Sequence, residues 1–243
     1  MKDMPRIEID THLLNRFVNI SNETLTMQLY HQGLRQCFLR GLKPLNRDHA
    51  RFVGIAFTMR LIPAREDIDT YDSLLSSDPQ DNLQWEAVKQ IGEYEVLIVD
   101  SRNCGEGASG GDILFTYMMQ KGVAGVVTDG ALRDSAQLSQ MPFPAYAREI
   151  CATTRVAHHH VADIQVPISC SNVAVYPGDV LVGDGEGVVV VPRHLAPKII
   201  DACEQQEALE DYILQRLLKG EDLQGLYPPT PKIKAEFEEW RKI

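Results

Sequence analysis

The middle of the chain alternates between short, almost wholly apolar runs and loop or helical segments. Residues 95–100 read EVLIVD and residues 124–129 read AGVVTD, and both runs are typical of strands that are buried on two faces. Between them lie a glycine-rich loop, RNCGEGASGG (102–111), and a helical stretch, DILFTYMMQK (112–121), which Gly122 closes. This order of strand, glycine loop, helix and strand predicts a βαβ unit.

The N-terminal part of the chain favours helices followed by a strand. Residues 10–32 predict two short helices, of which Ser21 or Asn22 caps the second and Gly33 ends it. The run FVGIAFTMRLIP (52–63) is rich in β-forming residues and stops at a proline. A further helix is expected near 82–90, after a polar stretch that we interpret as a loop.

From about residue 140 the pattern changes to short strands between turn residues, and we expect these strands to form a second sheet. His194 to Lys219 is helical, because its apolar residues recur at spacings of three, four or six. The sequence therefore predicts one α/β domain over residues 1–225. Residues 226–243 are expected to form a linker (226–232) and a short charged helix that docks on the body or on a neighbouring subunit.

Composition and charge narrow the possible functions. The 243 residues include 34 Asp and Glu against 24 Lys and Arg, a formal net charge of −10, so a nucleic-acid partner is not expected. Five scattered cysteines, with no Cys-x-x-Cys pair, favour reduced thiols in a cytoplasmic setting. The first residues lack the apolar core of a signal peptide, and no apolar run is long enough to span a membrane.

Polar groups gather where the βαβ unit should bind a ligand. The glycine loop and the helix that begins at Asp112 offer backbone N–H groups and the positive end of a helix dipole, which favour an anion. The second strand leads to Arg133 and Asp134, and strand ends and helix starts share one edge of such a sheet. An arginine fork beside carboxylates suits a metal-chelated oxo acid.

Ordinary structural roles compete with this interpretation. Asp112 alone is a common helix cap, and Arg133 with Asp134 is a common ion pair in a turn. The adjacent residues His158, His159 and His160 invite a metal site, but neighbouring side chains point in different directions and do not converge easily.

The motifs of the chain resemble one known family. Twenty residues separate Asp112 from the pair Arg133–Asp134, giving the pattern D-x20-R-D, and the surrounding segments GGDIL, KGVAGVVTDGALRD, FPAYAR and VYPGDVLVGDGEGVVVVP fit as well. This combination resembles the family of 4-hydroxy-4-methyl-2-oxoglutarate/4-carboxy-4-hydroxy-2-oxoadipate aldolases, which also contains the regulator of ribonuclease activity A. The resemblance covers roughly residues 20–220.

The resemblance implies a swivelling β/β/α domain, with N-terminal helices and a C-terminal helical extension in this chain. Its members are usually homotrimers or hexamers with active sites between subunits. It implies a divalent metal, Mg²⁺ or Mn²⁺, bound by Asp134 directly and by Asp112 through water. A glutamate from the C-terminal helix of a neighbouring subunit completes such a site, and Glu207 is the nearest match, with Glu210 next. The implied substrate-binding groups are Arg133 and the N–H groups of Gly111, Asp112, Ile113 and Leu114.

The function implied is a class II type, metal-dependent carbon–carbon lyase. It would cleave a 2-oxo acid by a retro-aldol reaction or decarboxylate it through a pyruvate-type enolate, with oxaloacetate decarboxylation as a side activity. Arg133, Asp112 and Glu207 are the expected catalytic residues. Two alternatives stay open: a hydratase or dehydratase of sugar-derived oxo acids, and a non-catalytic protein that modulates a ribonuclease.

Overall fold

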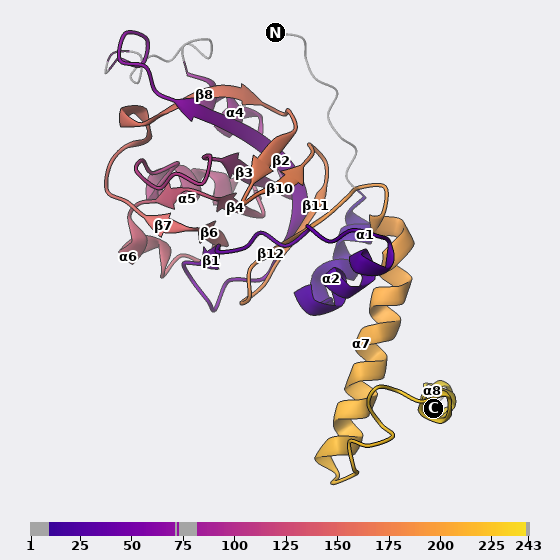
Figure 1. Cartoon of the computed structure of the whole chain (residues 1–243). Coiled ribbons are helices and arrows are strands. Elements are labelled where there is room, and N and C mark those ends of the chain that lie inside the picture. Colours follow the sequence, from indigo (N-terminus) through magenta and orange to yellow (C-terminus); the bar gives the residue numbers. More distant parts are fainter. Residues whose placement is uncertain (1–9, 71, 73–81, 242–243) are drawn as a thin grey trace.

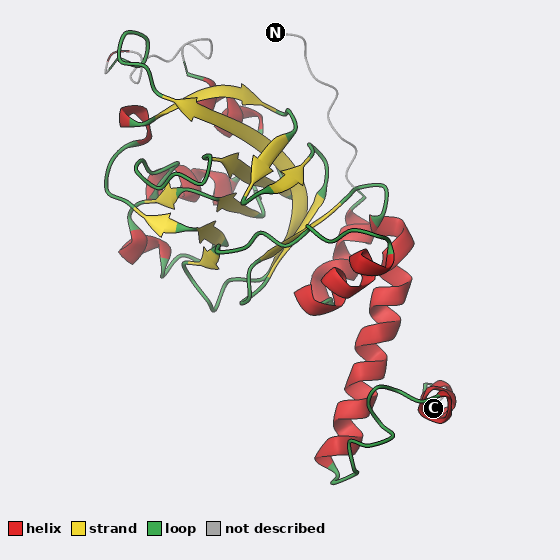
Figure 2. Cartoon of the chain, viewed as in Figure 1, coloured by secondary structure: helices red, strands yellow, loops and turns green. Residues whose placement is uncertain are grey.

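A mixed β-sheet forms the centre of the computed structural model, which describes residues 10–70, 72 and 82–241 (Figure 1, Figure 2). Eight strands of the described chain belong to this sheet. In spatial order they are β1 (Lys43–Pro44), β6 (Ala145–Ala147), β4 (Gly125–Thr128), β3 (Glu95–Asp100), β2 (Phe52–Pro63), β11 (Val180–Gly183) and β12 (Val188–Val191), with β8 (His159–Ile164) paired to β2.

The long strand β2 organises this sheet. It pairs in parallel with β3, where Ile55 lies opposite Glu95, and antiparallel with β11, where Val53 lies opposite Val182. Its final residues, from Met59 onward, pair with β8 across a register shift. Because β2 spans 12 residues, β11 can pair with its first part and β8 with its last part. The later strands β6, β8, β11 and β12 therefore belong to this same sheet, and the prediction of a separate second sheet is wrong for them.

The predicted βαβ unit is confirmed. Strand β3, helix α5 (Asp112–Gln120) and strand β4 follow one another, and β3 and β4 pair in parallel. After β4 comes a short strand, β5 (Ala131–Leu132), which pairs with β7 (Glu149–Ile150). Between β2 and α7 the described chain also contains helix α4 (Leu83–Gln90), helix α6 (Ser135–Leu138), the 3-10 turn η2 (Arg155–Ala157) and the hairpin of β9 (Ile168–Cys170) with β10 (Val173–Val175).

Helices cover the β11–β12 end of the sheet (Figure 1). They are α1 (Thr11–Arg16), the 3-10 turn η1 (Phe17–Asn19), α2 (Asn22–His31) and the first half of α7 (Ala196–Leu218). The side chains of Phe17, Leu25, Ile199 and Cys203 are buried there against Val189 of the sheet. This apolar contact anchors the helices α1 and α2 and the first half of α7 to the same region of the sheet.

The second half of α7 projects away from the sheet and carries α8 (Pro231–Trp240) at its far end (Figure 1). A small apolar cluster joins the two helices, with Tyr212 and Ile213 of α7 packed near Ile233 and Phe237 of α8. Helix α8 begins at Pro231, so the predicted linker is shorter than 226–232. Within one chain α8 docks on α7; its contact with a neighbouring subunit stays a prediction. No helix in the described part of the chain has the length and apolarity to cross a membrane.

Glu207 of α7 fastens this helix to the start of α2. Its Oε1 accepts hydrogen bonds from the backbone N–H of Ser21 at 2.8 Å and from the Ser21 hydroxyl at 2.7 Å. The same hydroxyl accepts from the N–H of Thr24 and so caps α2. Burial raises the pKa of the Glu207 carboxyl, but the hydrogen bonds from Ser21 outweigh it and hold that pKa below its usual range.

Replacing Glu207 by alanine is expected to lower the free energy of unfolding by about 1–2 kcal/mol at neutral pH, because two hydrogen bonds to a carboxylate are lost. The lowered pKa means that this contribution is present above the pKa of the unfolded chain, near 4.5, and is lost as the pH falls through the folded value. Urea unfolding of the wild type, Glu207→Ala and the exposed control Asp211→Ala, at neutral and acidic pH, measures the effect. An equal loss in both variants, or a loss independent of pH, would contradict this role.

Candidate functional site

A cavity of about 270 Å³ lies at the N-terminus of α5, at the edge of the sheet where β3 and β4 end. Its wall comes from four places in the sequence: the start of α4, the loop before α5 with the first turn of α5, the residues just after β5, and the residues at the start of η2. The lining residues include Gly111, Asp112, Ile113, Leu114, Arg133 and Asp134. All the site residues predicted from the βαβ unit therefore meet in one cavity.

Backbone pairing draws the glycine loop against the chain that follows β5. Ser109 N donates to Ala131 O at 2.8 Å, and Arg133 N donates to Gly110 O at 3.1 Å. At the end of this contact, a Cβ atom on Gly111 would lie 2.1 Å from Asp134 Oδ2 and would collide with it. Only glycine allows the Asp134 carboxylate to lie this close to the start of α5.

Asp112 is the first residue of α5, and Gly111 holds the capping position that the sequence suggested for Asp112. The Asp112 Oδ1 atom accepts a hydrogen bond from the N–H of Ile113 at 2.7 Å, and Asp112 N donates to Asp134 Oδ2 at 3.3 Å. Carboxylates in the first turn of a helix are stabilised by its dipole. Two carboxylates thus share one helix N-terminus.

Arg133 and Asp134 form an open ion pair at the rim of this cavity. Arg133 Nε lies 3.3 Å from Asp134 Oδ2, and the two side chains are 44% and 32% exposed. Asp134 has a left-handed backbone with φ of 57°, a conformation that costs energy in a residue with a side chain and that is often found in functional sites. An exposed pair of this kind adds little stability, so both charges are available to a ligand.

The two helix glutamates proposed from the sequence lie elsewhere within the chain. Glu207 is bonded to Ser21, as described above, and Glu210 accepts a hydrogen bond from Gln206 Nε2. Neither residue lines the cavity at α5. Because the expectation concerned Glu207 of a neighbouring subunit, its role in a site stays a prediction.

Sequence reasoning missed Asn82, Gln84, Thr154 and Arg155, four polar residues of the cavity. Arg155 is buried, and its guanidinium donates to Gln84 Oε1 and to the carbonyl of His159, both at 2.8 Å. Burial lowers the pKa of Arg155 to about 10. Asn82 is also buried, and its Oδ1 has no hydrogen-bond partner among the residues that the structure describes. Arg155 lies 71 positions from Gln84, and no local pattern brings them together.

The three adjacent histidines do not converge. His158 lies near Glu106, the ring of His159 is bonded to Arg102 Nη2, and His160 Nδ1 contacts Asp69 Oδ1. Burial lowers the pKa of His159 to about 4. Over residues 10–70, 72 and 82–241, no group of three or more His, Cys, Asp or Glu side chains is arranged to hold a metal ion.

The family model described as RraA-like, Aldolase/RraA, matches residues 18–190. The chain belongs to the RraA-like family. Among relatives of this RraA-like protein, an uncharacterised protein of Methanocaldococcus jannaschii is 28% identical over 214 residues, 88% of this chain and 95% of the relative. A 4-hydroxy-4-methyl-2-oxoglutarate aldolase of Thermus thermophilus is 32% identical over 146 residues, 59% of this chain and 77% of the relative.

Solved structures agree on the fold. The crystal structure of Streptomyces coelicolor RraAS2, described as an unusual member of the RNase ES inhibitor RraA protein family, superposes with a TM-score of 0.76. It is 26% identical, and the match covers 86% of this chain and 98% of that one. The α/β fold of the RraA-like type, predicted from the sequence motifs, is confirmed.

The residues of the cavity fit a divalent cation. Asp112 and Asp134 both line the cavity and supply carboxylate oxygens, and hard cations such as Mg²⁺ prefer oxygen ligands. Two carboxylates with water in the remaining positions suit Mg²⁺, which dehydrates reluctantly. The small number of protein ligands is thus consistent with an open site that a substrate can share.

Replacing Gly111 by alanine should displace Asp134 while leaving the fold intact, because the new Cβ would occupy the place of Asp134 Oδ2. Gly185→Ala is the matched control, since a Cβ there meets nothing within 4 Å. Crystal structures and thermal unfolding of both variants test this. A Gly111→Ala structure with Asp134 unmoved would show that the close approach does not set the position of the carboxylate.

Proposed function

We propose that this RraA-like protein is a divalent-metal-dependent lyase that cleaves or decarboxylates a 2-oxo acid. The observation that carries the proposal is the meeting of Asp112, Arg133 and Asp134 at the N-terminus of α5 in one cavity. The relative from Thermus thermophilus that is named an aldolase of a 2-oxo acid supports the same class of reaction.

Each end of the cavity offers groups for one part of such a substrate. The N–H groups at the start of α5, from Gly111 to Leu114, and the Arg133 guanidinium suit the 1-carboxylate and the 2-oxo group. Asn82 and Arg155 stand at the wall formed by α4 and the chain before β8 and can bind the distal part of the substrate. Gln84 accepts from Arg155 Nε and donates to Ser109 O, so it fixes the direction of that guanidinium.

The proposed reaction breaks the C3–C4 bond of the substrate. The electron pair of that bond moves toward C2, the negative charge grows on the 2-oxygen, and C4 becomes a carbonyl as its hydroxyl proton leaves. Arg133 stabilises the charge on the 2-oxygen of the resulting enolate. Asp112, beside it, takes up the hydroxyl proton. When carbon dioxide is the leaving group, the same enolate forms.

A bound Mg²⁺ or Mn²⁺ would add Lewis-acid stabilisation of the same developing charge. Asp134 would bind it directly and Asp112 would bind it through water. We further propose a homotrimer or hexamer in which Glu207 of a neighbouring subunit completes the site, and a cytoplasmic location. Within the chain, Glu207 is engaged by Ser21, so this part of the proposal requires that contact to change or to be shared.

The alternative of a non-catalytic ribonuclease modulator is favoured by one relative, the Streptomyces coelicolor protein of the RNase ES inhibitor RraA family. A modulator needs a surface for its partner and no paired carboxylates at a helix N-terminus. A chain that lacks metal-dependent turnover with every 2-oxo acid tried, and that inhibits a ribonuclease, would support the alternative.

Asp134→Ala is expected to abolish metal-dependent release of pyruvate from oxaloacetate and from branched 4-hydroxy-2-oxo acids, because the direct metal ligand is lost. The exposed Asp48 provides the control variant Asp48→Ala, which should keep wild-type activity. Pyruvate is measured with Mg²⁺, with Mn²⁺ and with EDTA, alongside circular dichroism. Equal activity of the wild type and Asp134→Ala in the presence of metal would overturn the assignment.

Arg133→Lys is expected to lower kcat by roughly 10²–10³, because lysine keeps the charge but lacks the planar fork that faces the 2-oxygen. Affinity for Mn²⁺ should change much less, since arginine supplies no ligand atom. Arg47→Lys, at an exposed position, is the matched control. Near wild-type turnover in Arg133→Lys would reduce Arg133 to the partner of Asp134 in an ion pair.

A further inference from the structure

A second polar cavity, of about 340 Å³, lies between the segment of residues 35–40 and the loop that joins β9 to β10. None of its lining residues lines the cavity at α5. Three arginines line it, Arg35, Arg40 and Arg148, together with Gln36, Phe38, Ser171, Asn172 and Val173. No acidic residue of the described chain is among the lining residues, which sets this cavity apart in a protein of net charge −10.

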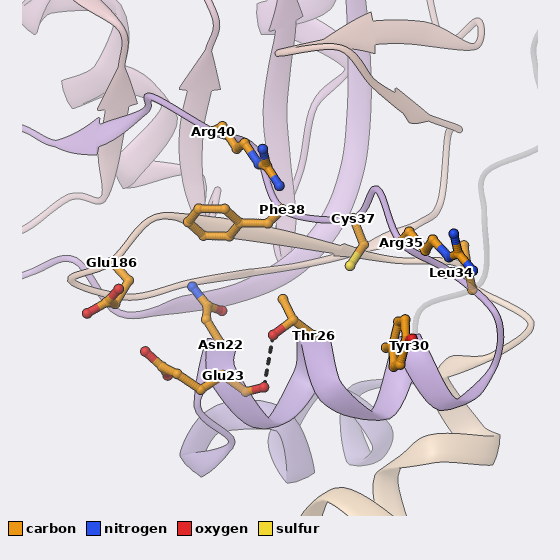
Figure 3. Close-up of a pocket in the computed structure, with 10 residues that line it drawn as sticks. All are labelled: Asn22, Glu23, Thr26, Tyr30, Leu34, Arg35, Cys37, Phe38, Arg40 and Glu186. Carbon is orange, nitrogen blue, oxygen red and sulfur yellow. Dashed lines mark hydrogen bonds between the residues drawn. The ribbon is translucent and has the colours of Figure 1, made fainter.

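The segment that carries Arg35 and Arg40 also borders a third cavity, of about 460 Å³, on α2 (Figure 3). That cavity includes the carboxylates of Glu23 and Glu186, so its charges are mixed. Figure 3 shows Arg35 and Arg40 on one extended segment, with Cys37 and Phe38 between them. Arg35, Phe38 and Arg40 line both cavities, and Arg148 lines only the cavity at the β9–β10 loop.

The three arginines lack an ion-pair partner in the described part of the chain. Among the described residues, no carboxylate lies within 4 Å of the guanidinium nitrogens of Arg35, Arg40 or Arg148. Arg148 donates only to neutral oxygens: Asp129 O at 3.1 Å, Asn103 Oδ1 and Ser171 Oγ at 2.8 Å, and Arg40 O at 3.3 Å. These bonds fix the Arg148 guanidinium in place without an ion pair among the described residues.

The backbone around Arg148 is held in an unusual conformation. Asn103, Ser171 and Asn172 all have left-handed φ angles, between 50° and 62°. The buried carboxylate of Asp129 accepts hydrogen bonds from the N–H groups of Asn103 and Ser171 and so holds both loops. Clustered left-handed residues cost energy and are typical of ligand-binding regions. Ser171 and Asn172, which these loops present to the cavity, add uncharged hydrogen-bonding groups beside the guanidiniums.

We propose that Arg35, Arg40 and Arg148 form a binding site for a phosphate group carried by a small molecule, separate from the candidate site at α5. Guanidinium groups bind phosphate oxygens through paired hydrogen bonds, and a dianion matches several positive charges. The volume suits a small ligand. An extended nucleic acid is disfavoured by the net charge of −10, because it would meet repulsion beyond the cavity.

The test is titration calorimetry of the full chain with inorganic phosphate, without divalent metal and at constant ionic strength. The double variant Arg35→Gln/Arg40→Gln removes two exposed charges and should weaken phosphate binding at least about tenfold. Arg47→Gln, an exposed arginine outside the cavity, is the matched control and should bind as the wild type does. Arg148→Lys is titrated in the same way. Its thermal unfolding is measured as well, because Arg148 also holds two loops.

Arg133→Gln separates the two sites, because it removes the guanidinium that lines the cavity at α5, and phosphate should bind to this variant as tightly as to the wild type. Loss of phosphate binding in Arg133→Gln would place the anion at α5 and overturn the proposal. Equal binding by the wild type and the double variant would overturn it as well. So would binding of a single-stranded oligonucleotide with steep salt dependence and no binding of phosphate, because the arginines would then belong to a nucleic-acid surface. None of these outcomes depends on lyase activity.

Discussion

The contact between Gly111 and Asp134 is the constraint on which the candidate site depends. Because Gly111 has no side chain, the Asp134 carboxylate can reach the N–H group of Asp112, the first residue of α5. The dipole of that helix and the Arg133 guanidinium then surround two carboxylates that would otherwise repel each other. The arrangement places negative ligands for a cation and positive groups for an oxyanion within one small cavity.

The same strands support both cavities. Strand β5 leads to Arg133 and is paired with β7, and the N–H groups of Arg148 and Glu149, just before that pairing, donate to Gly130 O. Behind them the Asp129 carboxylate, which burial gives a raised pKa, accepts bonds from Ser101, Asn103 and Ser171. One buried acidic residue thus ties together the loops near Arg148 and the chain that carries Arg133.

Local patterns in the sequence were sufficient to predict the βαβ unit and the place of the candidate site at its edge. The apolar run at 95–100, the glycine loop and the helix at 112–121 each have a period or composition that specifies the element, and the edge rule for parallel strands then places Asp112 near Asp134. The joining of β8 and β11 to β2 could not be predicted in this way, because it depends on the length of β2. The pairs Gln84–Arg155 and Ser21–Glu207 join residues 71 and 186 positions apart and have no local signal.

The position of a metal and a substrate analogue in one crystal tests the central claim most directly. Oxalate resembles the enolate of pyruvate, and Mn²⁺ can be located by its anomalous scattering. The account predicts Mn²⁺ within ligand distance of an Asp134 carboxylate oxygen, with oxalate between the metal, Arg133 and the N-terminus of α5. Well-occupied Mn²⁺ and oxalate at another place, with the cavity at α5 filled only by water, would contradict it.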